Sequence, residues 1–239
     1  MSILDVATRK VVRRLKAAQV PYNLAFTRDG RACYLLDWGD ESQLVIVGLP
    51  SLDVEGRIEV STWPAHMIFT PDGRYGFVTS ETAGNVTVVD TAERKIVRVL
   101  EAGGDAMGMA ISPEGRFLYY GNGEAGSVSK VDLRTYEVVK TIPVGGKIHE
   151  TALTVDGKFL YVGLRLQRKV AVLRTADDSV IRTIPTDAWP DLIFMEPGGR
   201  YAYVTNRTAN LVTVIDVTTH RIVTKIPVGK APHGMAYLP

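Results

Sequence analysis

The chain repeats itself with a period of 42 residues, with one step of 43, and this repeat limits its fold more than any other feature. The glycine of a Pro-Asp-Gly-Arg-like turn recurs at Gly30, Gly73, Gly115, Gly157 and Gly199. The residue that closes the following apolar run recurs with the same spacing, at Asp5, Gly48, Asp90, Asp132, Arg174 and Asp216. A fixed period of this size is typical of repeat architectures, so each local pattern belongs to a repeated unit.

Within a unit, short alternating apolar runs are separated by turn-forming residues, which predicts strands in a meander. The fifth unit shows the pattern best. Its four predicted strands are Asp191–Met195, Arg200–Thr205, Leu211–Val217 and Arg221–Val228. No segment of the chain has a clear helical period.

A single four-stranded meander exposes apolar side chains on both faces, so it needs a neighbouring sheet on each side. Radial stacking about an axis provides these neighbours for every sheet. The expected fold is therefore all-β, a β-propeller of four-stranded antiparallel blades in a single domain over 1–239. We expect five complete blades and a sixth incomplete blade shared by the two termini. The complete blades are 20–61, 62–103, 104–145, 146–187 and 188–229, and the split blade combines 1–19 with 230–239.

The split blade lacks the segment equivalent to 72–85, which contains the second strand of a blade. Three arrangements remain open. The blade closes with three strands, its open edge pairs with a second copy in a dimer, or the chain is part of a larger propeller.

Several segments resemble the YVTN-type β-propeller repeat, which is related to surface-layer and WD-repeat-like propellers. They are Tyr203–Asn206, Val212–Asp216 and Ile226–Gly229, with weaker copies at Phe77–Ser80, Val86–Asp90 and Thr141–Gly145. The resemblance covers almost the whole chain and implies the propeller fold. It suggests a periplasmic or cell-surface location, and it spans surface-layer proteins, lactonase-like propellers and haem-carrying nitrite reductase domains.

Composition provides little evidence for a charged partner. The 28 Lys and Arg residues against 26 Asp and Glu give a net charge of +2, so we expect no nucleic-acid binding. The single cysteine, Cys33, excludes an internal disulfide and a multi-cysteine metal site. The first residues lack the pattern of a signal peptide, and no apolar run approaches the ~18 residues of a membrane span.

Polar and aromatic residues gather at the predicted start of strand one, where the loops of one rim meet. We expect these positions to form the mouth of a channel that binds a ligand. The candidates are Tyr22, Trp63, His66, His149, Glu150, Trp189, Asp191 and His233. An alternative interpretation is that a narrow channel collects such side chains without binding anything, and that the tryptophans cap the core between blades.

The loops between strands two and three differ in charge. Asp37, Asp40 and Glu41 make the loop of the first blade acidic, and Arg165, Arg168 and Lys169 make that of the fourth basic. In a six-bladed ring these loops are expected to lie opposite each other, which favours an oriented partner.

A basic residue also follows each turn glycine, at Arg31, Arg74, Arg116, Lys158 and Arg200, and its regular repetition indicates a structural role.

No catalytic motif is present: the sequence has no nucleophile elbow, phosphate-binding glycine loop or zinc-protease pattern. We therefore predict a binding or scaffold propeller without catalytic residues, metal or cofactor. Its rim loops would recognise a protein, peptide or surface polymer. One alternative is an enzyme or cofactor carrier, either lactonase-like or of haem or quinone type, that uses the polar residues at the channel mouth. Another is a structural module of a surface array.

Overall fold

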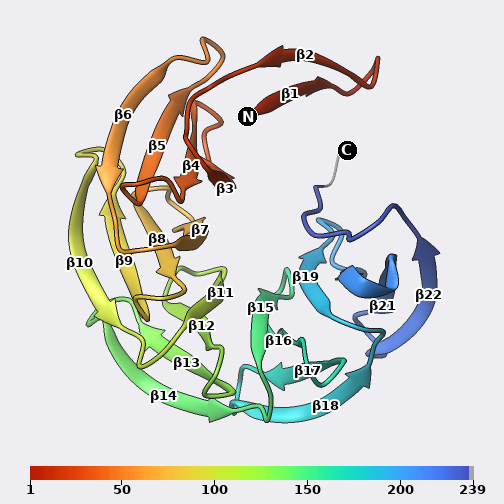
Figure 1. Cartoon of the computed structure of the whole chain (residues 1–239). Helices are drawn as coiled ribbons and strands as arrows, with labels where there is room; N and C mark the ends of the chain where they lie inside the picture. The colour runs from red at the N-terminus through yellow and green to blue at the C-terminus, as the bar shows by residue number, and fades with distance from the viewer. Residues whose placement is uncertain (237–239) are drawn as a thin grey trace. The chain divides into compact units, whose positions relative to one another are not determined.

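The computed structural model describes residues 1–236, which fall into two compact units, Met1–Glu101 and a second unit that begins at Ala102. Both units consist of antiparallel sheets, coloured from red to yellow in the first unit and from green to blue in the second (Figure 1). Whether the two units form the predicted single domain over 1–239 depends on how they pack together, so this stays a prediction.

Unit 1 contains a two-stranded sheet and two four-stranded sheets. The two-stranded sheet pairs β1 (Ser2–Asp5) with β2 (Lys10–Arg14). The first four-stranded sheet comprises β3 (Pro21–Phe26), β4 (Ala32–Asp37), β5 (Gln43–Gly48) and β6 (Val54–Glu59). The second comprises β7 (Pro64–Phe69), β8 (Tyr75–Ser80), β9 (Asn85–Asp90) and β10 (Lys95–Glu101).

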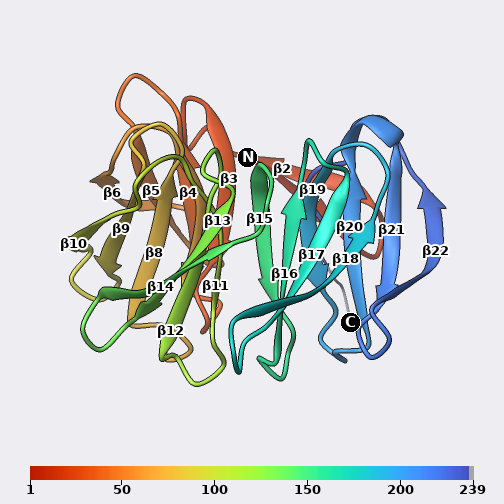
Figure 2. The same ribbon diagram turned by 90° about the horizontal axis from the view of Figure 1, so that it is seen from below.

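Unit 2 contains three four-stranded sheets whose strands follow one another in chain order (Figure 2). The first comprises β11 (Ala106–Ile111), β12 (Phe117–Asn122), β13 (Ser127–Asp132) and β14 (Glu137–Pro143). The second comprises β15 (Ile148–Leu153), β16 (Phe159–Leu164), β17 (Lys169–Arg174) and β18 (Ser179–Pro185). The third comprises β19 (Pro190–Met195), β20 (Tyr201–Asn206), β21 (Leu211–Asp216) and β22 (Arg221–Pro227).

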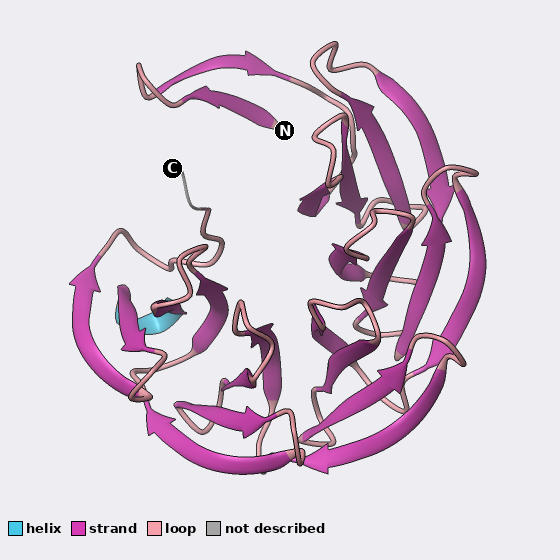
Figure 3. Cartoon of the chain, turned by 180° about the vertical axis from the view of Figure 1, so that it is seen from behind, coloured by secondary structure: helices cyan, strands magenta, loops and turns pink. Residues whose placement is uncertain are grey.

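The prediction of an all-β chain built from four-stranded antiparallel sheets is confirmed. In the fifth repeat the predicted strand boundaries agree with β19–β22 to within one residue. Among the described residues the one helical segment is a 3-10 turn at Arg207–Ala209, drawn in cyan in Figure 3. In that part of the chain, no helix has the length and apolar character needed to cross a membrane.

Burial changes systematically across each sheet. All six residues of β9 are buried, whereas β10 at the edge of the same sheet is almost entirely exposed. The middle strands therefore need apolar residues on both faces, such as Val86, Val88 and Val89, because neighbouring sheets cover both faces. The exposed edge strand β10 carries three charged residues, Lys95, Arg98 and Glu101, which are typical of a sheet edge that faces water.

The turn between strands one and two follows one design in most repeats. In the second repeat, Gly73 has a φ of +73°, a left-handed conformation that glycine adopts without steric strain. The amide of Gly73 donates to the carbonyl oxygen of Thr70 over 2.8 Å, and the carboxylate of Asp72 accepts from the Arg74 amide over 3.0 Å. These bonds fix the register of the two strands.

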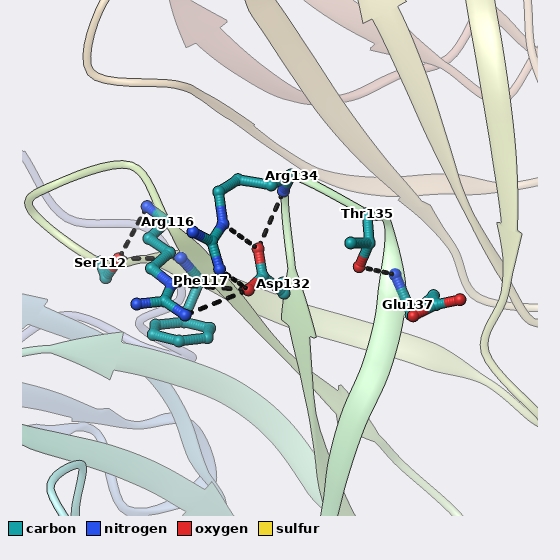
Figure 4. A network of polar contacts seen from close by, with 7 residues as sticks. All are labelled: Ser112, Arg116, Phe117, Asp132, Arg134, Thr135 and Glu137. Atoms are coloured by element: carbon teal, nitrogen blue, oxygen red, sulfur yellow. Dashed lines mark hydrogen bonds and ion pairs between the residues drawn. The ribbon is translucent and has the colours of Figure 1, made fainter.

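The basic residue after each turn glycine forms local contacts. In Figure 4, Arg116 lies beside Phe117, with its guanidinium carbon 4.7 Å from the ring centroid, and reaches Asp132 at 3.4 Å. The side chain of Arg134 also donates to Asp132, and this bonding holds the pKa of the carboxyl far below its usual range. The same arginine-over-ring contact occurs in two other sheets, for Arg74 over Tyr75 and Arg200 over Tyr201.

The two ends of the chain contain the segments predicted to share a sixth blade. At the N-terminus, β1 and β2 form an antiparallel hairpin within the predicted segment 1–19. At the other end, residues 230–236 of the predicted segment 230–239 carry no strand, and residues 237–239 lie outside the described residues. The shared blade stays a prediction.

Candidate ligand-binding rim

In the four-stranded sheets, strand one begins beside the end of strand two, as shown by Pro190 opposite Asn206 and Pro64 opposite Ser80. The loop after strand two and the segment before strand one therefore lie at the same end of the sheet. We call this end the rim of each unit. Most of the candidate residues predicted from the sequence lie there.

The rim of unit 2 carries a charged group of residues that we call the Asp191 cluster: Arg165, Trp189, Asp191 and Arg207. Asp191 is wholly buried, and the Nε of Arg165 donates to its Oδ1 over 2.7 Å. The guanidinium of Arg207 lies 3.8 Å from Oδ2. Arg165 also lies over the Trp189 ring, 5.1 Å from the ring centroid. The two arginines therefore compensate the negative charge of the buried Asp191 carboxylate.

His149 lies next to this cluster in a defined orientation. Its Nδ1 is 2.9 Å from the backbone carbonyl oxygen of Asp191. A carbonyl oxygen only accepts hydrogen bonds, so Nδ1 carries the proton and Nε2 is the basic nitrogen of the neutral ring. The ring of His233 meets that of His149 edge to face at 5.8 Å, and burial lowers the pKa of His233.

Glu150 faces the other way. Its Oε1 accepts from the amide of Thr151 over 2.9 Å, and its carboxyl group lies against Gly108 on β11. A Cβ on Gly108 would lie 2.6 Å from the Cα of Glu150, so only glycine allows this approach. Burial raises the pKa of Glu150 to about 8. His149 therefore reaches toward β19, whereas the Glu150 carboxyl group lies against β11.

The rim of unit 1 carries an aromatic stack in place of ions. The rings of Tyr22 and Trp38 are 3.9 Å apart at an interplanar angle of 14°, and those of Trp38 and Trp63 are 5.1 Å apart at 16°. The indole Nε1 of Trp38 donates to the carbonyl oxygen of Pro64 over 2.8 Å. Trp63 keeps 45% of its surface exposed, so the stack has an open end.

Sequence reasoning missed Trp38, Arg207 and Thr205 as rim residues. A signal for the first two was available, because Trp38 and Arg207 follow strand two directly, at the position of Arg165. The side chain of Thr205 donates to the carbonyl oxygen of His233 and accepts from the amide of Leu192. Nothing in the sequence separates it from the other strand threonines.

The rim charges differ from the sequence interpretation at two residues. Asp37 was expected to make its loop acidic, yet it is wholly buried and accepts from the amides of Gln19 and Val20. Its carboxylate fixes the entry to β3 and contributes no charge to the surface. Asp40 and Glu41 are exposed, as are Arg168 and Lys169, whereas Arg165 is engaged within the Asp191 cluster.

The remaining predicted residue, His66, belongs to unit 1. It is buried, and its backbone amide donates to the Thr79 hydroxyl over 3.1 Å. Its grouping with His149 and His233 around one channel stays a prediction. Within residues 1–236, no three His, Cys, Asp or Glu side chains are placed to hold a metal ion.

The repeated four-stranded antiparallel sheets are those of a β-propeller, and comparison with known proteins identifies the family. The model of the YNCE-like beta-propeller family matches residues 10–191 and 179–239. The chain belongs to this family. The predicted β-propeller fold is thereby confirmed, whereas a specific YVTN or WD-repeat relationship is not.

Two solved structures share the fold. The chain is similar to hydrazine synthase from Kuenenia stuttgartiensis, with 17% identity and a TM-score of 0.68, over 89% of this chain and 88% of that one. It is similar to the dihydro-heme d1 dehydrogenase NirN in complex with DHE, with 15% identity and a TM-score of 0.68. That match covers 95% of this chain and 61% of NirN. No curated protein matches the chain.

Proposed function

We propose that this chain is a binding β-propeller without chemistry of its own, and that its rim loops recognise a protein, peptide or surface polymer. The main support is the state of the loop after β16. Arg165 is held by Asp191 and Trp189, whereas the next basic residues, Arg168 and Lys169, project into solvent. A fixed base that carries free cations suits the recognition of an anionic segment.

The test separates the free cations from the structural one. At low salt, an immobilised acidic peptide of ten residues should bind the protein more strongly than a neutral peptide of the same length, in which glutamine replaces each acidic residue. Arg168→Gln combined with Lys169→Gln should weaken this binding about tenfold. The control pair Lys95→Gln and Arg98→Gln lies on exposed β10 and should leave binding unchanged. Equal loss in both double variants would show a nonspecific charge effect and contradict the proposal.

A second candidate is an enzyme or a cofactor-carrying propeller. Its specific support is the orientation of His149, whose Nε2 is the basic nitrogen, beside a second imidazole, His233. NirN, which has the same fold, is described in complex with DHE. An absorption spectrum and elemental analysis of the purified protein test this candidate. A visible chromophore or a stoichiometric metal would favour it over the binding function.

We also propose that the repeat is of YVTN type, because Tyr203–Asn206 and Ile226–Gly229 match that pattern. A separate proposal is that the open sheet edge near β1 pairs with a second copy of the chain in a dimer. Sedimentation across a hundredfold range of concentration tests the dimer. A constant monomer mass would exclude it.

A further inference from the structure

One repeat position contains an aromatic ring in every four-stranded sheet except the first. It is the residue after the recurring basic residue, and it is occupied by Tyr75, Phe117, Phe159 and Tyr201. In the first sheet the same position is Ala32, which begins β4. In three of these four sheets the preceding arginine covers the ring, as Arg116 does for Phe117. Arg31 has no ring to cover, and its side chain is 86% exposed.

A pocket lies where the missing ring would be. It has a volume of about 650 Å3 and lies in unit 1, at the end of β4 opposite the rim. A pocket of this size is within the range of small-molecule sites. Its apolar wall includes Ala32, Tyr34 and Ile46. Its charged wall combines three arginines, Arg28, Arg31 and Arg94, with three carboxylates, Asp29, Glu55 and Asp72. We call it the Ala32 pocket.

Unit 2 shows how the same place is filled when the ring is present. There Phe159 and His220 meet edge to face at 4.6 Å, and the hydroxyl of Tyr161 lies 2.6 Å from Nδ1 of His220. The corresponding pocket is smaller, about 480 Å3, and Phe159 forms part of its lining. Unit 1 keeps the tyrosine, as Tyr34, and replaces the other two residues with Ala32 and Arg94.

The charged groups around the Ala32 pocket are not equivalent. Arg94 is committed to Glu55, whose side chain and carbonyl oxygen both accept from it. The carboxylate of Asp29 accepts from the Thr27 hydroxyl over 2.7 Å and from the Arg31 amide over 3.0 Å, so it serves the turn. The exposed guanidinium of Arg31 lies 3.8 Å from Asp29. This leaves Arg28 and Arg31 as the cations most able to reach a ligand.

We propose that the Ala32 pocket binds a small planar aromatic ring that carries an anionic group. The ring takes the place of the side chain that the other four sheets provide, between Tyr34 and the guanidinium of Arg31, where cation-π attraction adds to apolar burial. The anionic group meets Arg28 and Arg31 at the mouth. This site is independent of the rim and of the function proposed there.

Calorimetric titration with indole-3-carboxylate tests the proposal. We expect one site per chain, at least tenfold weaker binding of cyclohexanecarboxylate, and weaker binding of the cationic ring tryptamine. Equal affinity for cyclohexanecarboxylate, whose ring is saturated, would show that aromatic character is not recognised. Stronger binding of tryptamine would show that the carboxylates of the pocket dominate. Either outcome overturns the proposal.

Variants locate the site. Ala32→Phe restores the ring and should reduce the affinity for indole-3-carboxylate at least tenfold, and Ala32→Leu should give an intermediate loss. Ala32→Ser keeps the pocket open and should bind within twofold of the parent. Arg31→Gln should weaken binding several-fold, whereas Lys158→Gln, its counterpart in unit 2, should not. The Arg31 and Lys158 pair tests the site even if Ala32→Phe does not fold. Unchanged binding in Arg31→Gln, or in a folded Ala32→Phe, overturns the proposal.

Discussion

The same pair of repeat positions forms a different kind of contact in each unit, because one position changes from tryptophan to arginine. The residue that follows strand two is Trp38 after β4 and Arg165 after β16, and the residue that precedes strand one is Trp63 before β7 and Trp189 before β19. Both pairs come into contact, through stacked rings in unit 1 and through a guanidinium over a ring in unit 2. The backbone repeat therefore decides which side chains meet, and the residue types decide which force joins them.

Both tryptophans have a φ of +58°, in the left-handed region that a bulky residue rarely adopts. Such a conformation costs roughly 1–2 kcal/mol. The contact with Trp38 or Arg165 provides a compensating interaction in each unit. The difference is that the buried carboxylate of unit 2, Asp191, pairs with this arginine, whereas the buried carboxylate of unit 1, Asp37, accepts from backbone amides. Unit 2 should therefore respond to charge changes that leave unit 1 unaffected.

The largest expected effect comes from removing the buried carboxylate. Asp191→Ala leaves Arg165, which is 17% exposed, without its partner, and should lower the free energy of unfolding by about 3–5 kcal/mol. Denaturant titration measures the change. Asp187→Ala breaks the more exposed pair with Lys225 and should cost under about 1 kcal/mol. Similar losses for both variants would mean that the Asp191 cluster is not a buried ionic site.

The second effect is on pH dependence. The pKa of Glu150 is about 8 in the folded protein, above its usual value of 4.5, so the folded state binds this proton more tightly than the unfolded state does. Its contribution to stability is present below about pH 4.5 and is lost as the pH rises through about 8. The loss is on the order of a few kcal/mol.

Denaturant titrations at pH 5, 7 and 9 measure this dependence. Glu150→Gln keeps a carbonyl oxygen for the Thr151 amide and removes the titrating group. The variant should lose less stability than the parent between pH 5 and pH 9. Parallel pH profiles for the two proteins would contradict the raised pKa.

The third effect belongs to unit 1. Trp38→Ala removes the central ring of the stack and the hydrogen bond to Pro64, and should destabilise the protein by about 2 kcal/mol, because the ring is only partly buried. Trp38→Phe keeps a ring but not the donor, and should cost about half as much. Differential scanning calorimetry would show the order. If Trp38→Phe were as unstable as Trp38→Ala, the stack would contribute little.

The sequence contained most of the information that sets the fold. The turn glycines fixed the repeat, and the strands around Tyr203 fell within one residue of their predicted bounds, because period-two alternation and tight turns are local signals. The same reasoning identified the rim positions of Asp191 and Trp189. The place of a residue within the repeat follows from the sequence alone, because it does not depend on the rotamer of the side chain.

The contacts of those residues were not predictable in the same way. Asp37 and Asp40 are three residues apart, yet one caps backbone amides inside unit 1 and the other is exposed. Likewise Arg165 turns inward while Arg168 does not. Such choices depend on buried donors supplied by other strands, which the local pattern does not encode. The Ala32 pocket could be recognised only in the structure, by comparing its volume with that of the corresponding pocket in unit 2.

The smallest effect distinguishes the two forces directly. A double-mutant cycle on Arg165 and Trp189, using Arg165→Gln and Trp189→Leu, should give a coupling energy of about 0.5–1 kcal/mol. Part of this coupling is electrostatic, because the guanidinium of Arg165 carries a positive charge over the ring. The matching cycle on Trp38 and Trp63, with leucine at both positions, should give about 0.5–1.5 kcal/mol. Raising the salt concentration from about 0.1 to 1 M shortens the screening length from about 10 to 3 Å, so the first coupling should fall while the second stays constant. Because both cycles share one backbone geometry, any difference in salt response reports the side chains alone. Equal responses would mean that the guanidinium of Arg165 acts on Trp189 as a flat apolar surface, and that its charge is satisfied entirely by Asp191.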